Sequence, residues 1–79
     1  MKTNGVYKRA YNQCLDLLAG RAPGEVLASE PTLAAELGVS RTTVRAVITG
    51  LVERGIVGQE GRERRLLRLP SRADYLDSA

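Results

Sequence analysis

A turn between two helices constrains this chain more than any other feature of its sequence. It lies in the stretch from Leu37 to Val57, which reads LGVSRTTVRAVITGLVERGIV. Gly38 can take the left-handed backbone conformation that closes a helix. Ser40 can cap the next helix by accepting a hydrogen bond from a backbone amide. The stretch therefore predicts one helix that ends near Leu37 and a second that begins near Arg41.

The second helix has an apolar face and a polar face. Apolar side chains recur at spacings of three and four residues, which places them on one buried stripe. They are Val44, Val47, Ile48 and Leu51. A neighbouring face, which the core does not need, carries Arg41, Thr42, Arg45 and Thr49. Arginine can donate two hydrogen bonds to a guanine edge, and threonine can contact a base or a phosphate. The helix therefore either reads DNA or is an ordinary amphipathic helix with a solvated face.

Positive charge gathers in the half of the chain that contains this turn. Residues 40–70 contain seven arginines and three glutamates, whereas residues 1–39 contain four basic and four acidic side chains. The whole chain has a formal net charge of +3, so its excess positive charge lies in one half. This distribution indicates a polyanionic partner such as a nucleic acid.

The residue types that catalysis and metal binding need are scarce in this sequence. The chain has one cysteine, Cys14, and no histidine, which excludes an internal disulfide and metal sites based on cysteine or histidine. We interpret Cys14 as a small core residue. Without a nucleophile–base pair or a phosphate-binding glycine loop, the sequence predicts no enzyme and no cofactor. It has no membrane-length apolar run and no secretory segment, so we expect a cytoplasmic protein.

Two further helices are expected before the turn. Apolar residues recur with a helical period over residues 5–19. Within this helix, Tyr7 and Tyr11 lie one turn apart and form either a base-stacking platform or, as we favour, the edge of the core. Ser29 is a good cap for a short helix that ends at Gly38.

A β-hairpin is expected after Gly55, where the helical period ends. Residues 56–60 and residues 64–69 could each form a strand, with residues 61–63 as the turn. The tip of this hairpin carries Arg62, Arg64 and Arg65. Such a tip either reaches a phosphate or a minor groove, or only keeps the edge of the sheet soluble.

These elements define one small domain over residues 1–70. Three helices followed by a two-stranded hairpin give a mainly α fold, the winged helix-turn-helix. Residues 71–79 are polar apart from Tyr75 and Leu76, and we interpret them as a linker.

A longer motif runs through this domain. It consists of Pro23, Gly24, Leu27, Ser29, Glu30, Leu33, Ala34, Leu37, Gly38, Val39, Ser40, Arg41, Thr43, Val44, Arg45, Leu51, Glu53, Gly55, Ile56 and Val57. Over about residues 6–69 the chain thus resembles the N-terminal DNA-binding domain of the GntR family of bacterial transcription regulators. The resemblance implies a winged helix that binds double-stranded operator DNA as a homodimer. It also implies a C-terminal domain, absent from these 79 residues, that binds a small effector or drives dimerisation.

The resemblance implies roles for particular residues. Arg41 and Arg45 match the two recognition-helix arginines that read bases and backbone, and Gly61 and Arg62 match the wing tip that enters the minor groove. Pro31 stands where many members have a further DNA-contacting arginine, so that contact is not expected. The residues that we expect to contact DNA are Ser40, Arg41, Thr42, Thr43, Arg45, Thr49, Gly61, Arg62, Arg64 and Arg65.

Two functions from different classes follow from these observations. The favoured function is sequence-specific DNA binding by part of a transcriptional regulator, as a repressor under the control of an effector bound elsewhere. The alternative is a winged helix that binds another protein and has no DNA role. The exposed arginines of the second helix of the turn argue against this alternative.

Overall fold

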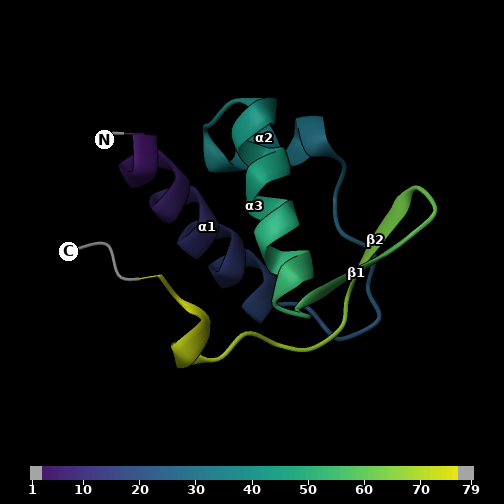
Figure 1. Ribbon diagram of the computed structural model, residues 1–79. Helices are drawn as coiled ribbons and strands as arrows, with labels where there is room; N and C mark the ends of the chain where they lie inside the picture. The colour runs from purple at the N-terminus through teal and green to yellow at the C-terminus, as the bar shows by residue number, and fades with distance from the viewer. Residues whose placement is uncertain (1–2, 77–79) are drawn as a thin grey trace.

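Three helices come first along the chain and an antiparallel hairpin follows them (Figure 1). The structure is a computed structural model, and it describes residues 3–76. Its elements are α1 (Thr3–Ala19), α2 (Glu30–Leu37), α3 (Arg41–Glu53), β1 (Val57–Glu60), β2 (Glu63–Leu66) and the short 3₁₀ helix η1 (Arg72–Asp74). The predicted order of three helices and a two-stranded wing is confirmed. Helix α1 begins two residues earlier than predicted, because its first two residues, Thr3 and Asn4, are polar and add no apolar signal to the sequence.

The turn between α2 and α3 is built as the sequence predicts. Gly38 has φ +70°, and its amide donates a hydrogen bond to the carbonyl of Ala34 at 2.8 Å. The Ser40 hydroxyl accepts a hydrogen bond from the Thr43 amide at 3.2 Å and so caps α3. Ser29 caps α2 in the same way. Each helix end is thus fixed by a local contact, and together these contacts set the direction of α3.

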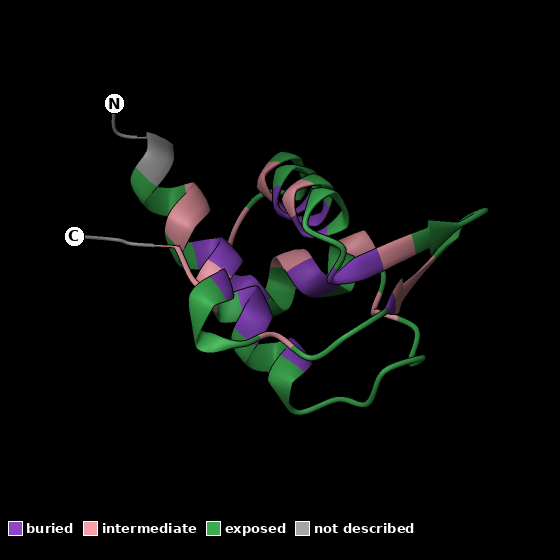
Figure 2. Cartoon of the chain, turned by 60° about the horizontal axis from the view of Figure 1, so that its bottom comes forward, coloured by how far each residue is buried: buried purple, intermediate pink, exposed green. Residues whose placement is uncertain are grey.

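The core lies between α1 and α3 and continues under the base of the hairpin (Figure 2). Its completely or almost completely buried side chains are Ala10, Tyr11, Cys14, Leu15, Val47, Leu51, Ile56, Val57 and Leu66. A smaller cluster of Leu33, Val44 and Ile48 joins α2 to α3. The Tyr7 and Tyr11 rings lie 5.7 Å apart, with Tyr11 in the core and Tyr7 packed against it. The interpretation of this pair as core edge is confirmed, and so is that of Cys14 as a core residue.

Gly50 allows α1 and α3 to approach closely. A Cβ atom at this position would lie 2.6 Å from Tyr7 Oη and 3.1 Å from Tyr11 Cε2. Glycine inside a helix costs about 1 kcal/mol relative to alanine. That cost is offset here because the ring of Tyr11 can occupy the space beside the α3 backbone.

The hairpin is shorter than the sequence predicts. Val57 pairs with Leu66 at its base, Glu60 pairs with Glu63 at its tip, and Gly61 takes φ +61° in the turn. The prediction of a strand over residues 64–69 is wrong beyond Leu66. Since β1 begins only at Val57, residues 67–69 have no strand beside them, and Leu67 is 55% exposed. The Leu67 amide still donates a hydrogen bond to the Ile56 carbonyl at 2.7 Å, but the alternating apolar residues do not continue β2 where no strand lies beside them.

A loop before α2 covers the free edge of β2. Val26 forms an antiparallel bridge with Arg65, and the Leu27 amide donates a hydrogen bond to the Arg64 carbonyl at 2.8 Å. The Leu66 amide in turn donates to the Glu25 carbonyl at 2.9 Å. These bonds satisfy backbone groups that an uncovered strand edge would leave unpaired.

The chain after the hairpin returns to α1, on the side of the molecule away from the hairpin tip (Figure 1). The Asn12 side chain exchanges two hydrogen bonds with the backbone of Leu76, at 2.9 and 2.8 Å. The Tyr75 hydroxyl donates to Asp16 at 2.6 Å. Residues 71–76, predicted as part of a linker, are therefore packed on the domain, whereas residues 77–79 lie outside the described residues. That this segment leads into a further domain stays a prediction.

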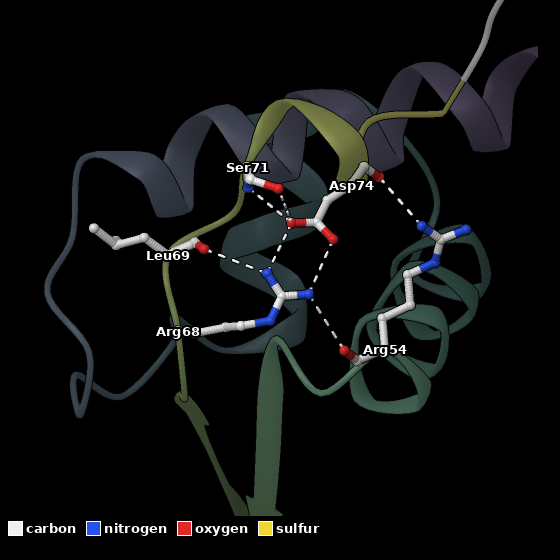
Figure 3. Close-up of polar contacts among 5 residues, drawn as sticks. All are labelled: Arg54, Arg68, Leu69, Ser71 and Asp74. Atoms are coloured by element: carbon white, nitrogen blue, oxygen red, sulfur yellow. Dashed lines mark hydrogen bonds and ion pairs between the residues drawn. The ribbon is translucent and has the colours of Figure 1, made fainter.

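Four residues, which we call the C-terminal clasp, hold this returning segment in place: Arg54, Arg68, Ser71 and Asp74 (Figure 3). Arg68 donates two hydrogen bonds to the buried Asp74 carboxylate, at 2.8 and 2.9 Å. The Ser71 amide donates to the same carboxylate at 2.7 Å. Arg54, at the end of α3, donates to the Asp74 carbonyl at 3.5 Å. The clasp thus connects the end of α3 to the segment that follows the hairpin.

The described residues contain no helix that is both long enough and apolar enough to cross a membrane. Within residues 3–76, histidine, cysteine, aspartate and glutamate form no group of three that could hold a metal ion.

Candidate nucleic-acid interface

The polar face of α3 is exposed as the sequence predicts. Arg41, Thr42, Arg45 and Thr49 are all exposed, while the opposite stripe of the same helix is buried. Ser40 and Thr43 differ from these four, because their hydroxyls lie 3.1 Å apart and belong to the helix cap. The structure therefore places two arginines and two threonines on an exposed surface of α3 that starts at the first residue of the helix. Backbone amides at such a terminus favour a phosphate.

One carboxylate joins this helix to the hairpin, and we call the group of three residues the Glu30 fork: Glu30, Arg45 and Arg64. One Glu30 oxygen accepts a hydrogen bond from Arg45 Nε at 3.0 Å, and the other accepts from Arg64 Nη2 at 3.1 Å. Hydrogen bonding to Arg45, and then to Arg64, holds the pKa of Glu30 below its ordinary value. The carboxylate is thus kept ionised between two arginines.

A groove runs between α3 and the hairpin beside this fork. Its lining residues are Glu30, Arg45, Ile48, Thr49, Val52, Glu53, Gln59 and Arg64. Arg45 and Thr49 line it from the exposed face of α3, and Arg64 lines it from β2. The groove therefore brings one arginine of the helix and one arginine of the hairpin to the same surface.

The three arginines predicted at the hairpin tip are not brought together. Arg62 follows Gly61 in the turn and is exposed, and the described residues make no ion pair with it. Arg64 belongs to the Glu30 fork. Arg65 donates to the Gly24 carbonyl at 3.0 Å and to Glu63 at 2.9 Å. Neighbouring strand residues point to opposite faces, which separates Arg64 from Arg65.

Sequence reasoning missed the Glu30 fork. In the sequence Glu30 is part of a motif, and nothing local to it predicts its contacts. Its partners lie 15 and 34 residues further along the chain, on α3 and β2. The signal that the sequence does offer is an acidic residue at the start of α2, followed by arginines on the exposed face of α3.

The three helices, the hairpin and the exposed arginine face define a winged helix-turn-helix protein of the DNA-binding class. The family model for bacterial regulatory proteins of the gntR family matches residues 7–65. The chain therefore belongs to the gntR family, and it is a DNA-binding domain of a transcription regulator.

The crystal structure of PhnF from Mycobacterium smegmatis is similar to this chain, with a TM-score of 0.70 and 27% sequence identity. The similarity covers 76% of this chain and 27% of the PhnF chain. The chain thus spans about a quarter of the protein that it resembles. No curated protein sequence matches it.

Proposed function

We propose that this chain is the operator-binding domain of a transcriptional repressor that reads double-stranded DNA with the exposed face of α3. The observation that carries the proposal is the placement of Arg41, Thr42, Arg45 and Thr49. All four are exposed on one helix whose opposite stripe is buried in the core. A helix held in this way can enter a major groove without loss of its packing.

Binding begins with electrostatic attraction and ends with base readout. The excess of arginine in residues 40–70 draws the domain to the phosphate backbone. The α3 N-terminus then contacts a phosphate, while Arg41 and Arg45 donate hydrogen bonds to base edges. Arg62, at the turn of the hairpin, reaches the adjacent backbone or minor groove. The domain has no catalytic role in this proposal.

We propose that two copies bind together on an inverted repeat. A two-fold pair would place its two α3 helices in successive major grooves, about 34 Å apart. An effector would act through a further domain that residues 71–79 precede, in a protein of the bacterial cytoplasm. The small share of PhnF that this chain covers is consistent with such a longer regulator.

Selection of bound duplexes from a random pool, followed by sequencing, tests the proposal. We expect an enriched inverted repeat, or one enriched half-site if pairing depends on a further domain. A pool without any enriched sequence, retained only at low salt, would contradict the proposal and favour a role in protein interaction.

A further inference from the structure

We propose that Glu30 is a positioning residue that sets the sequence specificity of this domain, because it holds Arg45 and Arg64 in one fixed arrangement. The inference rests on the proposed DNA-binding function. It assigns a specific role to an acidic residue on a surface where phosphate binding alone would favour none.

The geometry of the Glu30 fork differs from that of an ordinary surface ion pair. Each Glu30 oxygen accepts its own hydrogen bond, from Arg45 at 3.0 Å and from Arg64 at 3.1 Å. The side chains of Glu30 and Arg64 are only 14% and 24% exposed, whereas that of Arg45 is 66% exposed. The carboxylate is therefore held in place by two partners, while the outer end of Arg45 remains open to solvent.

Arg45 is held through the nitrogen that a guanine does not require. Glu30 accepts from Nε of Arg45, and no described residue accepts from its Nη1 or Nη2. These two nitrogens form the pair of donors that can bind O6 and N7 of one guanine. An arginine side chain that is already fixed at Nε loses less conformational freedom when it binds DNA. It also favours a base whose acceptor atoms lie where its two Nη donors point.

Arg64 extends the same restraint to the wing. It lies on β2, three elements along the chain from α2, and shares the carboxylate with Arg45. The wing and α3 are thereby linked by side chains as well as by the core beneath them. We infer that they approach DNA as one rigid surface, with Arg62 at a fixed distance from the major-groove helix.

The sign of the effect separates this role from simple electrostatics. Removing a negative charge from a DNA-facing surface should strengthen binding to any duplex. Loss of a positioning residue should instead weaken the preference for the correct duplex. Glu30→Gln, which keeps the shape of the side chain, is therefore expected to bind random duplex more tightly and to discriminate less.

The experiment compares the dissociation constants for the selected duplex and for a random duplex, measured at one salt concentration. We expect Glu30→Gln to lower the ratio between them by about tenfold, as for the loss of one bidentate base contact. Glu36→Gln is the matched control. This substitution makes the same charge change on the same helix. Glu36 lies beside Leu17 of α1 and does not line the groove between α3 and the hairpin, so the ratio should stay unchanged.

A double-mutant cycle with Arg45→Ala tests whether Glu30 acts through Arg45. In the Arg45→Ala background, Glu30→Gln should cause little further loss of discrimination, because coupled residues are not additive. Glu30→Asp should give an intermediate ratio, since its shorter side chain cannot reach both arginines. Melting temperatures of all variants check that the fold is retained.

Two outcomes would overturn the inference in different ways. If the wild-type domain discriminates and Glu30→Gln keeps its full ratio, the DNA-binding function stands and the role of Glu30 is wrong. If the wild-type domain does not discriminate, both the function and the role are wrong.

Discussion

At the scale of single residues, Arg41 and Arg45 belong to the same exposed face but differ in their contacts. Arg45 is held by Glu30, whereas no described residue makes an ion pair with Arg41. We expect Arg45→Ala to cost about 1–3 kcal/mol of binding free energy and to relax specificity at one base position. Binding to the selected duplex and to its single-base variants measures both effects. Unchanged affinity for the selected duplex would remove Arg45 from the recognition surface.

Asp74 gives the stability of the domain a dependence on pH. Hydrogen bonds from Arg68, and then from the Ser71 amide, hold the pKa of this carboxyl well below its ordinary value. A depressed pKa in the folded state stabilises the protein above the unfolded pKa of about 3.9. This stabilisation is lost as the pH falls further, because protonation removes the charge that Arg68 binds.

Asp74→Asn should therefore destabilise the domain at pH 7 by about 2 kcal/mol, the range of a hydrogen bond to a charged group. The difference from wild type should shrink below about pH 4. Urea unfolding followed by circular dichroism at pH 7 and at pH 3 measures this change. Glu36→Gln on the exposed surface serves as the control. If the difference in unfolding free energy between Asp74→Asn and the wild type stays constant with pH, the Asp74 charge does not stabilise the fold.

At the scale of the elements, the contact between α1 and α3 depends on the missing side chain of Gly50. Gly50→Ala should gain about 1 kcal/mol of helix propensity but lose about 1–3 kcal/mol to overpacking against Tyr7 and Tyr11. We expect a net loss of stability. Gly5→Ala in α1 is the matched control, because its new methyl group meets no atom within 4 Å, and it should stabilise the domain. Thermal unfolding measures the stability of both variants. An equal gain in stability for Gly50→Ala and Gly5→Ala would mean that α1 and α3 are not tightly packed.

Contacts between elements also explain which features of the structure the sequence could and could not predict. The turn at Gly38 and the cap at Ser40 depend on residues four or fewer positions away, so a local pattern predicts them. The second strand was predicted too long because its end depends on where β1 begins. The Glu30 fork and the C-terminal clasp could not be predicted, since they join residues from elements far apart in the sequence. The residue types at the candidate site were therefore readable from the sequence, but their pairing was not.

At the scale of the whole molecule, the arginines after the turn of the hairpin differ from Arg62 in their ion pairs. Arg64, Arg65 and Arg68 make ion pairs with acidic side chains, whereas Arg62 makes none among the described residues. We expect Arg62→Ala to weaken binding to all duplexes alike and to reduce the salt slope of log K by about 1. Fluorescence anisotropy between about 50 and 200 mM salt measures this slope. A change in base preference would instead assign Arg62 to direct readout.

The burial of Cys14 in the core has a consequence for the kinetics of this domain. Cys14 is 1% exposed, and burial raises the pKa of its thiol to about 11, so the native molecule offers little of the thiolate that reacts. Alkylation must therefore wait for an opening of the core between α1 and α3. Because the sequence contains no second cysteine, the rate of alkylation reports these openings without an added label. DNA that binds only the folded domain would slow the same reaction, so one native atom can report both the opening of the core and the occupancy of the distant surface.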